Sequence, residues 1–186
     1  MAASAAGLLV VGVALIIKHD PLQQPLALDP TTGWEEISWP LSPTPWWPSK
    51  AFVCTSATCG GDMTLYVRVK VGFCNCAEGI ADDGELERIA DFADLSRRHE
   101  PLADGKPIVL AGLKGRVRAY RMQVLGTSGR SVAAIVIGLN SGCDAVVATG
   151  VQHSPEEADT AARERAIATF LERQPTMQWT RTALGL

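Results

Sequence analysis

Residues 54–76 read CTSATCGGDMTLYVRVKVGFCNC, and the rest of the chain is organised around this stretch. Four cysteines bracket it, two at each end: Cys54, Cys59, Cys74 and Cys76. Between them lies the clearest strand pattern in the sequence. Apolar side chains occupy every second position from Leu65 to Phe73, which predicts an antiparallel strand that is buried on one face only. The residues that alternate with them are expected on the other face: Tyr66, Arg68 and Lys70.

The residues after this stretch predict further strands and turns. Apolar, β-branched runs separated by turn residues place strands near 107–111, 116–125, 131–139 and 145–151. Tight turns separate the last three runs, so we expect them to form an antiparallel meander.

Two helices are also expected in this part of the chain. Asp82 and Glu85 have the spacing of a capping box and predict a short helix that begins after Asp82. Ser154 followed by Pro155 predicts the start of a longer helix, and Pro175 predicts its end. The expected fold is therefore α+β, with one antiparallel sheet that carries both helices on one side.

The N-terminal residues 2–17 contain no charged side chain. A spanning helix needs about 20 apolar residues, with a lower limit of about 17, and this run is just short of that. A positive start and an A-x-A-like site, the marks of a cleaved signal peptide, are missing. A buried core helix is the alternative, but the run has no polar face. We therefore expect an uncleaved membrane anchor over residues 1–18.

Residues 19–50 are rich in proline and tryptophan. They hold seven of the eleven prolines, which excludes a long helix and favours an extended spacer between membrane and domain. They also hold four of the five tryptophans: Trp34, Trp39, Trp46 and Trp47. These rings are expected either to bind a partner protein or the lipid interface, or to cover the core of their own domain as an ordered strap. The cysteine-containing domain is then expected over residues 51–186.

The five cysteines support three hypotheses. The first is disulfides: Cys54 with Cys59 is the short-range pairing, and sheet pairing can bring Cys143 next to Cys74 or Cys76. The second is a zinc or copper(I) site made by the thiolates of the bracketing cysteines 54, 59, 74 and 76. The third is redox chemistry at the C-x-C sequence of residues 74–76.

The compartment decides between these hypotheses, because disulfides persist where the surroundings are oxidising. Lys18, which follows the apolar run, by itself favours a cytoplasmic domain. The cysteine content favours the opposite side. We expect a single-pass protein of a bacterial inner membrane with a periplasmic, disulfide-bonded domain.

Two resemblances accompany these patterns. The meander and the helix that ends at Phe170 and Leu171, over about residues 115–171, resemble the PsbP/Mog1-like fold of small anchored periplasmic proteins. The sequences W-P-x-x-x-x-P-W-W and G-F-C-N-C behind a short anchor are similar to those of small uncharacterised membrane-anchored bacterial proteins. Neither resemblance implies an activity.

Charge and motifs narrow the function classes. The net charge of −3 is not the basic balance expected of a nucleic-acid-binding protein. The chain has no H-E-x-x-H, G-x-S-x-G or P-loop sequence. We therefore expect a non-enzymatic accessory protein of a larger membrane or envelope complex, with no cofactor and no small-molecule substrate. The alternative is a thiol-based metal-binding or redox protein.

Overall fold

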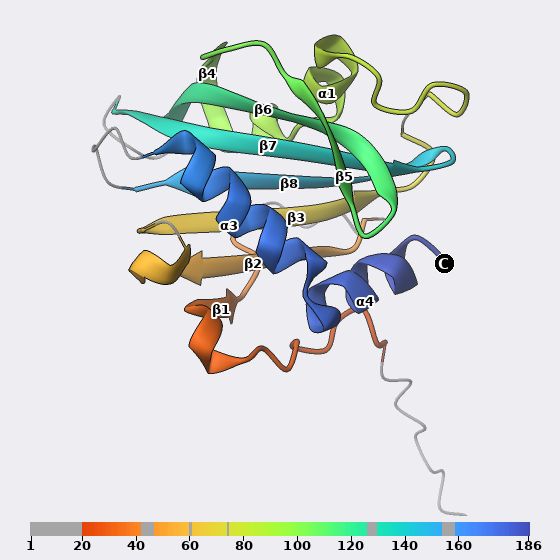
Figure 1. Cartoon of the computed structure of the whole chain (residues 1–186), viewed down its shortest axis with the longest axis horizontal. Helices are drawn as coiled ribbons and strands as arrows, with labels where there is room; N and C mark the ends of the chain where they lie inside the picture. Colours follow the sequence, from red (N-terminus) through yellow and green to blue (C-terminus); the bar gives the residue numbers. More distant parts are fainter. Residues whose placement is uncertain (1–19, 42–46, 60, 74, 126–129, 154–158) are drawn as a thin grey trace, which may run out of the picture.

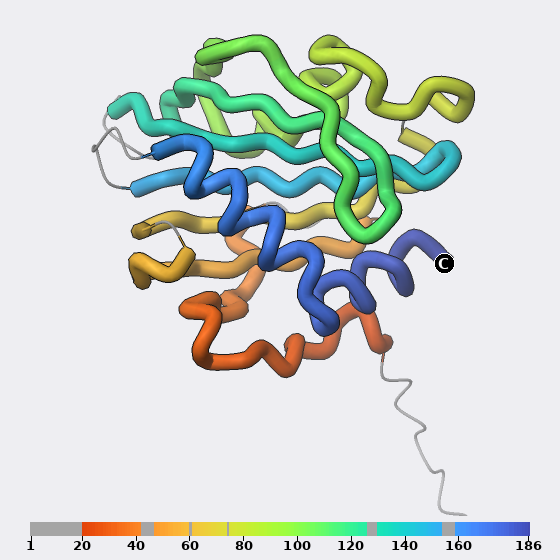
Figure 2. Tube along the Cα trace, in the orientation of Figure 1, coloured from red at the N-terminus to blue at the C-terminus, as the bar shows by residue number. Residues whose placement is uncertain are grey.

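A computed structural model describes residues 20–41, 47–59, 61–73, 75–125, 130–153 and 159–186. Within these residues, eight strands form one sheet: β1 (Trp34–Ile37), β2 (Ser49–Cys54), β3 (Met63–Lys70), β4 (Ser96–Pro101), β5 (Lys106–Leu110), β6 (Leu113–Val124), β7 (Ser131–Ser141) and β8 (Asp144–Gln152). The helices are α1 (Asp83–Ile89), α2 (Phe92–Leu95), α3 (Thr160–Glu172) and α4 (Gln174–Ala183), with short 3₁₀ helices at Pro30–Thr32 and Ala57–Cys59 (Figures 1 and 2).

The described strands all pair antiparallel, in the order β1-β2-β3-β8-β7-β6-β4, and β5 pairs with one end of β6. The predicted meander is present as β6, β7 and β8. β3, the strand of the cysteine-bracketed stretch, pairs with β8 from Met63 opposite Gln152 to Lys70 opposite Ala145. It therefore lies in the interior of the sheet, and the predicted α+β class with a large antiparallel sheet is confirmed.

Helices cover both faces of the sheet, so the predicted arrangement with helices on one side is wrong. α3 crosses one face, which contains Leu65 and Val67, and α4 follows it beside residues 21–27 (Figure 1). α1 and α2 pack on the other face with Tyr120 and Met122. β3 is consequently buried on both sides, and Arg68 is only 2% exposed. The sequence of β3 predicted one solvent-exposed face, because Arg68 and Lys70 alternate with apolar residues and charged side chains rarely point into a core.

Two glycines let the helices approach the sheet closely. A Cβ on Gly150 of β8 would overlap the Ile167 side chain of α3. On the other face, a Cβ on Gly138 of β7 would lie 2.8 Å from the Leu86 Cδ1 of α1. Both distances are too short for packed carbon atoms. Because glycine has no side chain, each helix can pack directly on the strand at that position.

The helix ends follow the sequence signals in part. The Asp82 carboxylate accepts a hydrogen bond from the Glu85 amide at 2.8 Å and caps α1 as predicted. α3 begins after a different cap, Asp159, while the predicted cap Ser154 lies outside the described residues. Pro175 follows the end of α3 and also starts α4, because proline suits the first turn of a helix.

Residues 20–41, here called the strap, belong to the folded domain. β1 pairs with β2 along their whole register, and the expected domain boundary at residue 51 falls inside β2. Hydrogen bonds from Lys50 Nζ to Gln24 O (2.7 Å) and from Trp179 Nε1 to Leu22 O (3.1 Å) tie the strap to the rest of the domain, and one from Leu26 N to Glu36 Oε2 (2.6 Å) joins two parts of the strap. The strap is therefore not an extended spacer.

Within the described ranges, no helix is long and apolar enough to cross a bilayer. The predicted anchor, residues 2–17, lies outside these ranges, so it stays a prediction.

Candidate functional site

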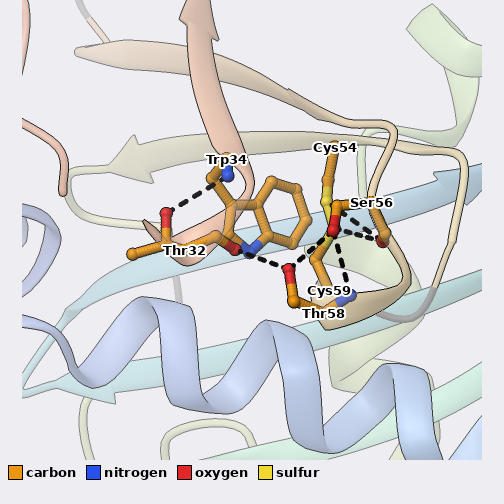
Figure 3. The surroundings of a disulfide bond; sticks show 6 residues. All are labelled: Thr32, Trp34, Cys54, Ser56, Thr58 and Cys59. Carbon is orange, nitrogen blue, oxygen red and sulfur yellow. Dashed lines mark hydrogen bonds between the residues drawn. A yellow bond between two sulfur atoms is a disulfide. The ribbon is translucent and has the colours of Figure 1, made fainter. Parts of the chain in front are cut away.

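The first disulfide, Cys54–Cys59, lies at the end of the sheet where β3 begins. Cys54 is the last residue of β2 and lies opposite Met63 of β3, and Cys59 ends a 3₁₀ helix. Their Cα atoms are 6.3 Å apart, and the residues are 0% and 1% exposed. This bridge is part of the core beside α3, and its sulfur atoms are shielded from solvent thiols (Figure 3).

Polar contacts join this disulfide loop to the strap (Figure 3). Thr58 Oγ1 donates a hydrogen bond to Thr32 O at 3.3 Å, and the Trp34 amide donates to Thr32 Oγ1 at 3.1 Å. Trp34 is 5% exposed and stacks on Phe170 of α3 at 4.8 Å. Its ring is therefore a core contact, with almost no surface left for a partner.

The second disulfide, Cys76–Cys143, lies beyond the other end of β3. It joins the loop over residues 71–82 to the turn between β7 and β8, and the two Cα atoms are 4.2 Å apart. Both residues are exposed. Two further contacts hold the same loop against that turn: Gly72 N to Asp144 Oδ1 (2.7 Å) and Ile80 N to Asn140 Oδ1 (3.4 Å).

Of the four bracketing cysteines, the three that the structure describes are not brought together at one site. Cys54 lies opposite Met63, the first residue of β3, whereas Cys76 lies in the loop beyond Lys70, its last residue. An eight-residue strand at about 3.3 Å per residue separates these positions by roughly 23 Å, but zinc thiolates lie about 2.3 Å from one ion. Cys74 lies outside the described residues. Among the residues that the structure describes, no group of three His, Cys, Asp or Glu side chains has metal-binding geometry.

Two buried cations on β3 form the most unusual polar cluster of the domain. Arg68 Nη1 donates to Asp91 Oδ1 at 2.8 Å and to Asp94 Oδ2 at 2.9 Å. Lys70 Nζ lies 2.8 Å from the same Asp91 oxygen and donates to Ile89 O at 2.6 Å. Asp91 is 7% exposed, so one buried carboxylate balances most of two buried positive charges.

Tryptophans cover this cation cluster from the side opposite to β3. The Trp39 ring lies 4.8 Å from the Arg68 guanidinium carbon, and the Trp47 ring lies 5.3 Å from Lys70 Nζ. These are cation–π distances, and they are more favourable where water is excluded. Trp39 and Trp47 keep partly exposed edges, and Trp46 lies outside the described residues. The described tryptophans of the expected docking set thus pack on their own domain.

Two adjoining clefts flank the strap. The first, here called the strap cleft, has a volume of about 360 Å³ and lies between residues 21–27 and α4, with Trp179 in its wall. Its lining residues carry no charge. The second cleft has about 420 Å³ and is lined in part by Glu36, Trp39 and Lys50. The first cleft, with apolar and amide side chains, suits an uncharged or amphipathic ligand. The second cleft, with Glu36 and Lys50, suits a polar or charged ligand.

Ion pairs fix α1 to β6 on the face of the sheet that carries α1 and α2. Asp83 accepts hydrogen bonds from the Arg116 guanidinium and from the Gly105 amide. Burial alone would raise the pKa of Asp83, but the Gly105 amide and the charges of Arg116 and Arg118 outweigh burial and lower it. Arg118 Nη1 also lies 2.8 Å from Glu87 Oε1. These acidic residues therefore position α1 on β6.

Both tyrosines of the chain should ionise late in the folded protein. Burial, with the nearby charge of Glu87 and against that of Arg118, raises the pKa of Tyr120 to about 12. Burial also raises the pKa of Tyr66, against a hydrogen bond with Thr64. At pH 10 the urea-unfolded chain should show about half of its phenolate absorbance, and the folded chain much less. Because the folded state holds the Tyr120 proton more tightly, this stabilisation is complete below pH 10 and is lost as the pH rises towards 12.

An ultraviolet titration of native and urea-unfolded protein measures this difference, and Tyr66→Phe and Tyr120→Phe assign each step. Equal phenolate absorbance of the two states at pH 10 would contradict the expected burial of both rings.

Comparisons with known proteins add little. No family model matches the chain, and no curated protein matches it. Among solved structures, the chain is similar to PA94, a Pseudomonas aeruginosa protein of unknown function suggested to be a regulator. The identity is 13%, the TM-score is 0.44, and the match covers 68% of this chain and 81% of that chain. These values assign neither a family nor a function.

Sequence reasoning missed Asp91 and Trp179. The signal for Asp91 was indirect: two cations inside a β-branched strand imply a buried counter-charge elsewhere in the chain. Nothing in the sequence around Trp179 connects it with Leu22, because that contact depends on how α4 lies beside the strap in the folded domain.

Proposed function

We propose that this chain is a membrane-tethered accessory protein whose domain works outside the cytoplasm as a partner or subunit of a larger membrane or envelope complex. The observation that supports this most is the pairing of four of the five cysteines in two disulfides. Such bonds are rare in the cytosol and persist in oxidising compartments. Residues 2–17 are the tether, and the domain is not an enzyme.

The second cleft is the proposed site for the protein partner. It lies beside β1, the edge strand of the sheet, and combines an aromatic ring at Trp39 with opposite charges at Glu36 and Lys50. Glu36 Oε1 and Lys50 Nζ are 2.6 Å apart, so the charges are already paired and offer hydrogen bonds without a large desolvation penalty. Aromatic anchors surrounded by such polar groups are typical of protein interfaces.

The full chain, expressed in a bacterium and alkylated after acid quenching, should carry one free thiol, because five cysteines minus the four in bridges leaves one. It should remain in carbonate-washed membranes, and protease added to spheroplasts should digest its domain. The Cys54→Ala/Cys59→Ala variant is the control. It removes only one bridge and both of its cysteines, so it should also carry one free thiol. Five free thiols in a protease-protected domain would refute an extracytoplasmic location.

The same cells distinguish the remaining alternatives. A photo-crosslinking residue at exposed Ser38, beside Trp39, should join the chain to a membrane protein, whereas one at Arg98 on β4 should not. A chain that stays uncrosslinked at Ser38 would contradict the accessory role. Partial reduction of Cys76–Cys143 with an intact Cys54–Cys59 bridge would favour the thiol-redox alternative, because only the former is exposed.

A further inference from the structure

The strap leaves almost no free chain between the proposed anchor and the domain. Pro21 already lines the strap cleft, and Leu22 O accepts the hydrogen bond from Trp179 Nε1. From Ile17 to Pro21 there are only four Cα steps of about 3.8 Å, or roughly 15 Å at full extension. A free linker over residues 18–50 at ~3.1 Å per residue would instead reach roughly 100 Å.

This short connection decides where the domain sits. Headgroups add about 5–8 Å on each side of the hydrocarbon core, since a bilayer of about 40–45 Å has a core of about 30 Å. With at most about 15 Å available, Pro21 and the helix bonded beside it must lie in the headgroup layer or within about 10 Å of it. The domain cannot stand away from the membrane while the strap is in place.

The chemistry of the strap cleft matches the lipid interface. Its walls combine apolar side chains, among them Leu22, Leu26 and Trp179, with amides of Gln24 and Gln178. Amide groups donate hydrogen bonds to ester carbonyl and phosphate oxygens, and the apolar walls suit the upper part of an acyl chain. Tryptophan is enriched at this depth of the bilayer. A water-soluble anion would find no counter-charge among the lining residues.

We therefore propose that the strap cleft faces the bilayer and binds a phospholipid of the membrane in which the chain is anchored. This inference rests on the proposed function, because it requires residues 2–17 to span that membrane. Leu186, three residues beyond the end of α4, is 59% exposed and would enter the same interface, where its side chain is no longer in water.

Quenching by brominated lipid tests the proposal on the full chain. Trp179 is only 4% exposed but lines the cleft, so vesicles of phosphatidylethanolamine and phosphatidylglycerol, with bromine on the upper acyl chain, should quench its ring from across the cleft wall. The fluorescence that Trp179 contributes, obtained as wild type minus Trp179→Phe, should fall about twofold or more relative to unbrominated vesicles. Trp34→Phe is the matched control: it removes a ring stacked on Phe170, so its loss should leave the lipid-quenched signal in place.

A second measurement does not depend on removing Trp179. Gln178 is exposed at the cleft, so a solvent-sensitive dye on Gln178→Cys, in a Cys74→Ser background, should shift to the blue in vesicles. The same dye on Arg98→Cys, on the far edge of the sheet, should not shift. An unshifted dye at residue 178, or equal quenching of wild type and Trp179→Phe, would overturn the lipid site.

Flotation of the same vesicles separates the two proposals. A chain that fails to float has no anchor, which refutes the tether and the lipid site together. A chain that floats without Trp179 quenching keeps its anchor and loses only the lipid site.

Discussion

Asp91→Asn should lower the free energy of unfolding by about 3–5 kcal/mol, because it removes the carboxylate from a buried ion pair and leaves the cations behind. Arg68 Nη1 and Lys70 Nζ each lie 2.8 Å from Asp91 Oδ1, and both cationic residues are under 5% exposed. An amide can still accept a hydrogen bond from one of them, but it cannot neutralise either charge. Urea unfolding at neutral pH, followed by tryptophan fluorescence, measures the loss.

Asp94→Asn is the matched control for this substitution. The Asp94 side chain is 38% exposed and its ion pair is with Arg68, so its loss should change the free energy of unfolding by less than about 1 kcal/mol. A triple variant, Arg68→Met, Lys70→Met and Asp91→Leu, should be more stable than Asp91→Asn, since it leaves no buried charge. If Asp91→Asn and Asp94→Asn were equally stable, the cluster would not depend on Asp91.

Cys76→Ser/Cys143→Ser should lower the free energy of unfolding by about 4 kcal/mol through the entropy of the unfolded chain. The bridge closes a loop with a sequence separation of 67, and its residues are exposed, so serine adds no buried polar group. The denaturant m value should rise as well, because the unfolded chain is no longer cross-linked. Guanidinium unfolding of the oxidised proteins gives both quantities.

Cys74→Ser should leave stability and m value unchanged, since both bridges remain. The same entropy relation gives only about 2 kcal/mol for Cys54–Cys59, whose sequence separation is 5. A Cys76→Ser/Cys143→Ser protein as stable as wild type would mean that polar contacts alone hold the loop over residues 71–82.

The strands that sequence predicted are those with their own apolar pattern, namely β3 and β5 to β8. Among the strands that it missed, β1 and β4 lack one, and β2 has only the short apolar run from Ala51 to Cys54. β1 contains Glu35 and Glu36, and β4 contains Arg97 and Arg98, so neither pattern identifies a buried face. These outer strands exist because of pairing with β2 and β6, and tertiary context sets strand formation more than local preference does.

The candidate site was predictable only where short-range information sufficed. The pairing of Cys54 with Cys59 was predictable because the two residues are only five positions apart. Cys143 was expected near residues 74 and 76 because sheet pairing brings these parts of the chain together. The buried cations were not predictable, because Asp91 belongs to a helix corner far along the chain from Arg68 and Lys70. The docking of α4 against the strap needs the whole fold.

The position of the Cys76–Cys143 bridge also governs how the domain would respond to mechanical tension between its anchor and its C-terminus. Force entering along β3 would cross from Cys76 to Cys143 through the covalent bond and continue into β8. The segment between them, which holds α1, α2 and β4 to β7, would carry no tension at all. A pulled molecule should therefore extend only by its outer parts, and should gain the remaining length after the bridge is reduced.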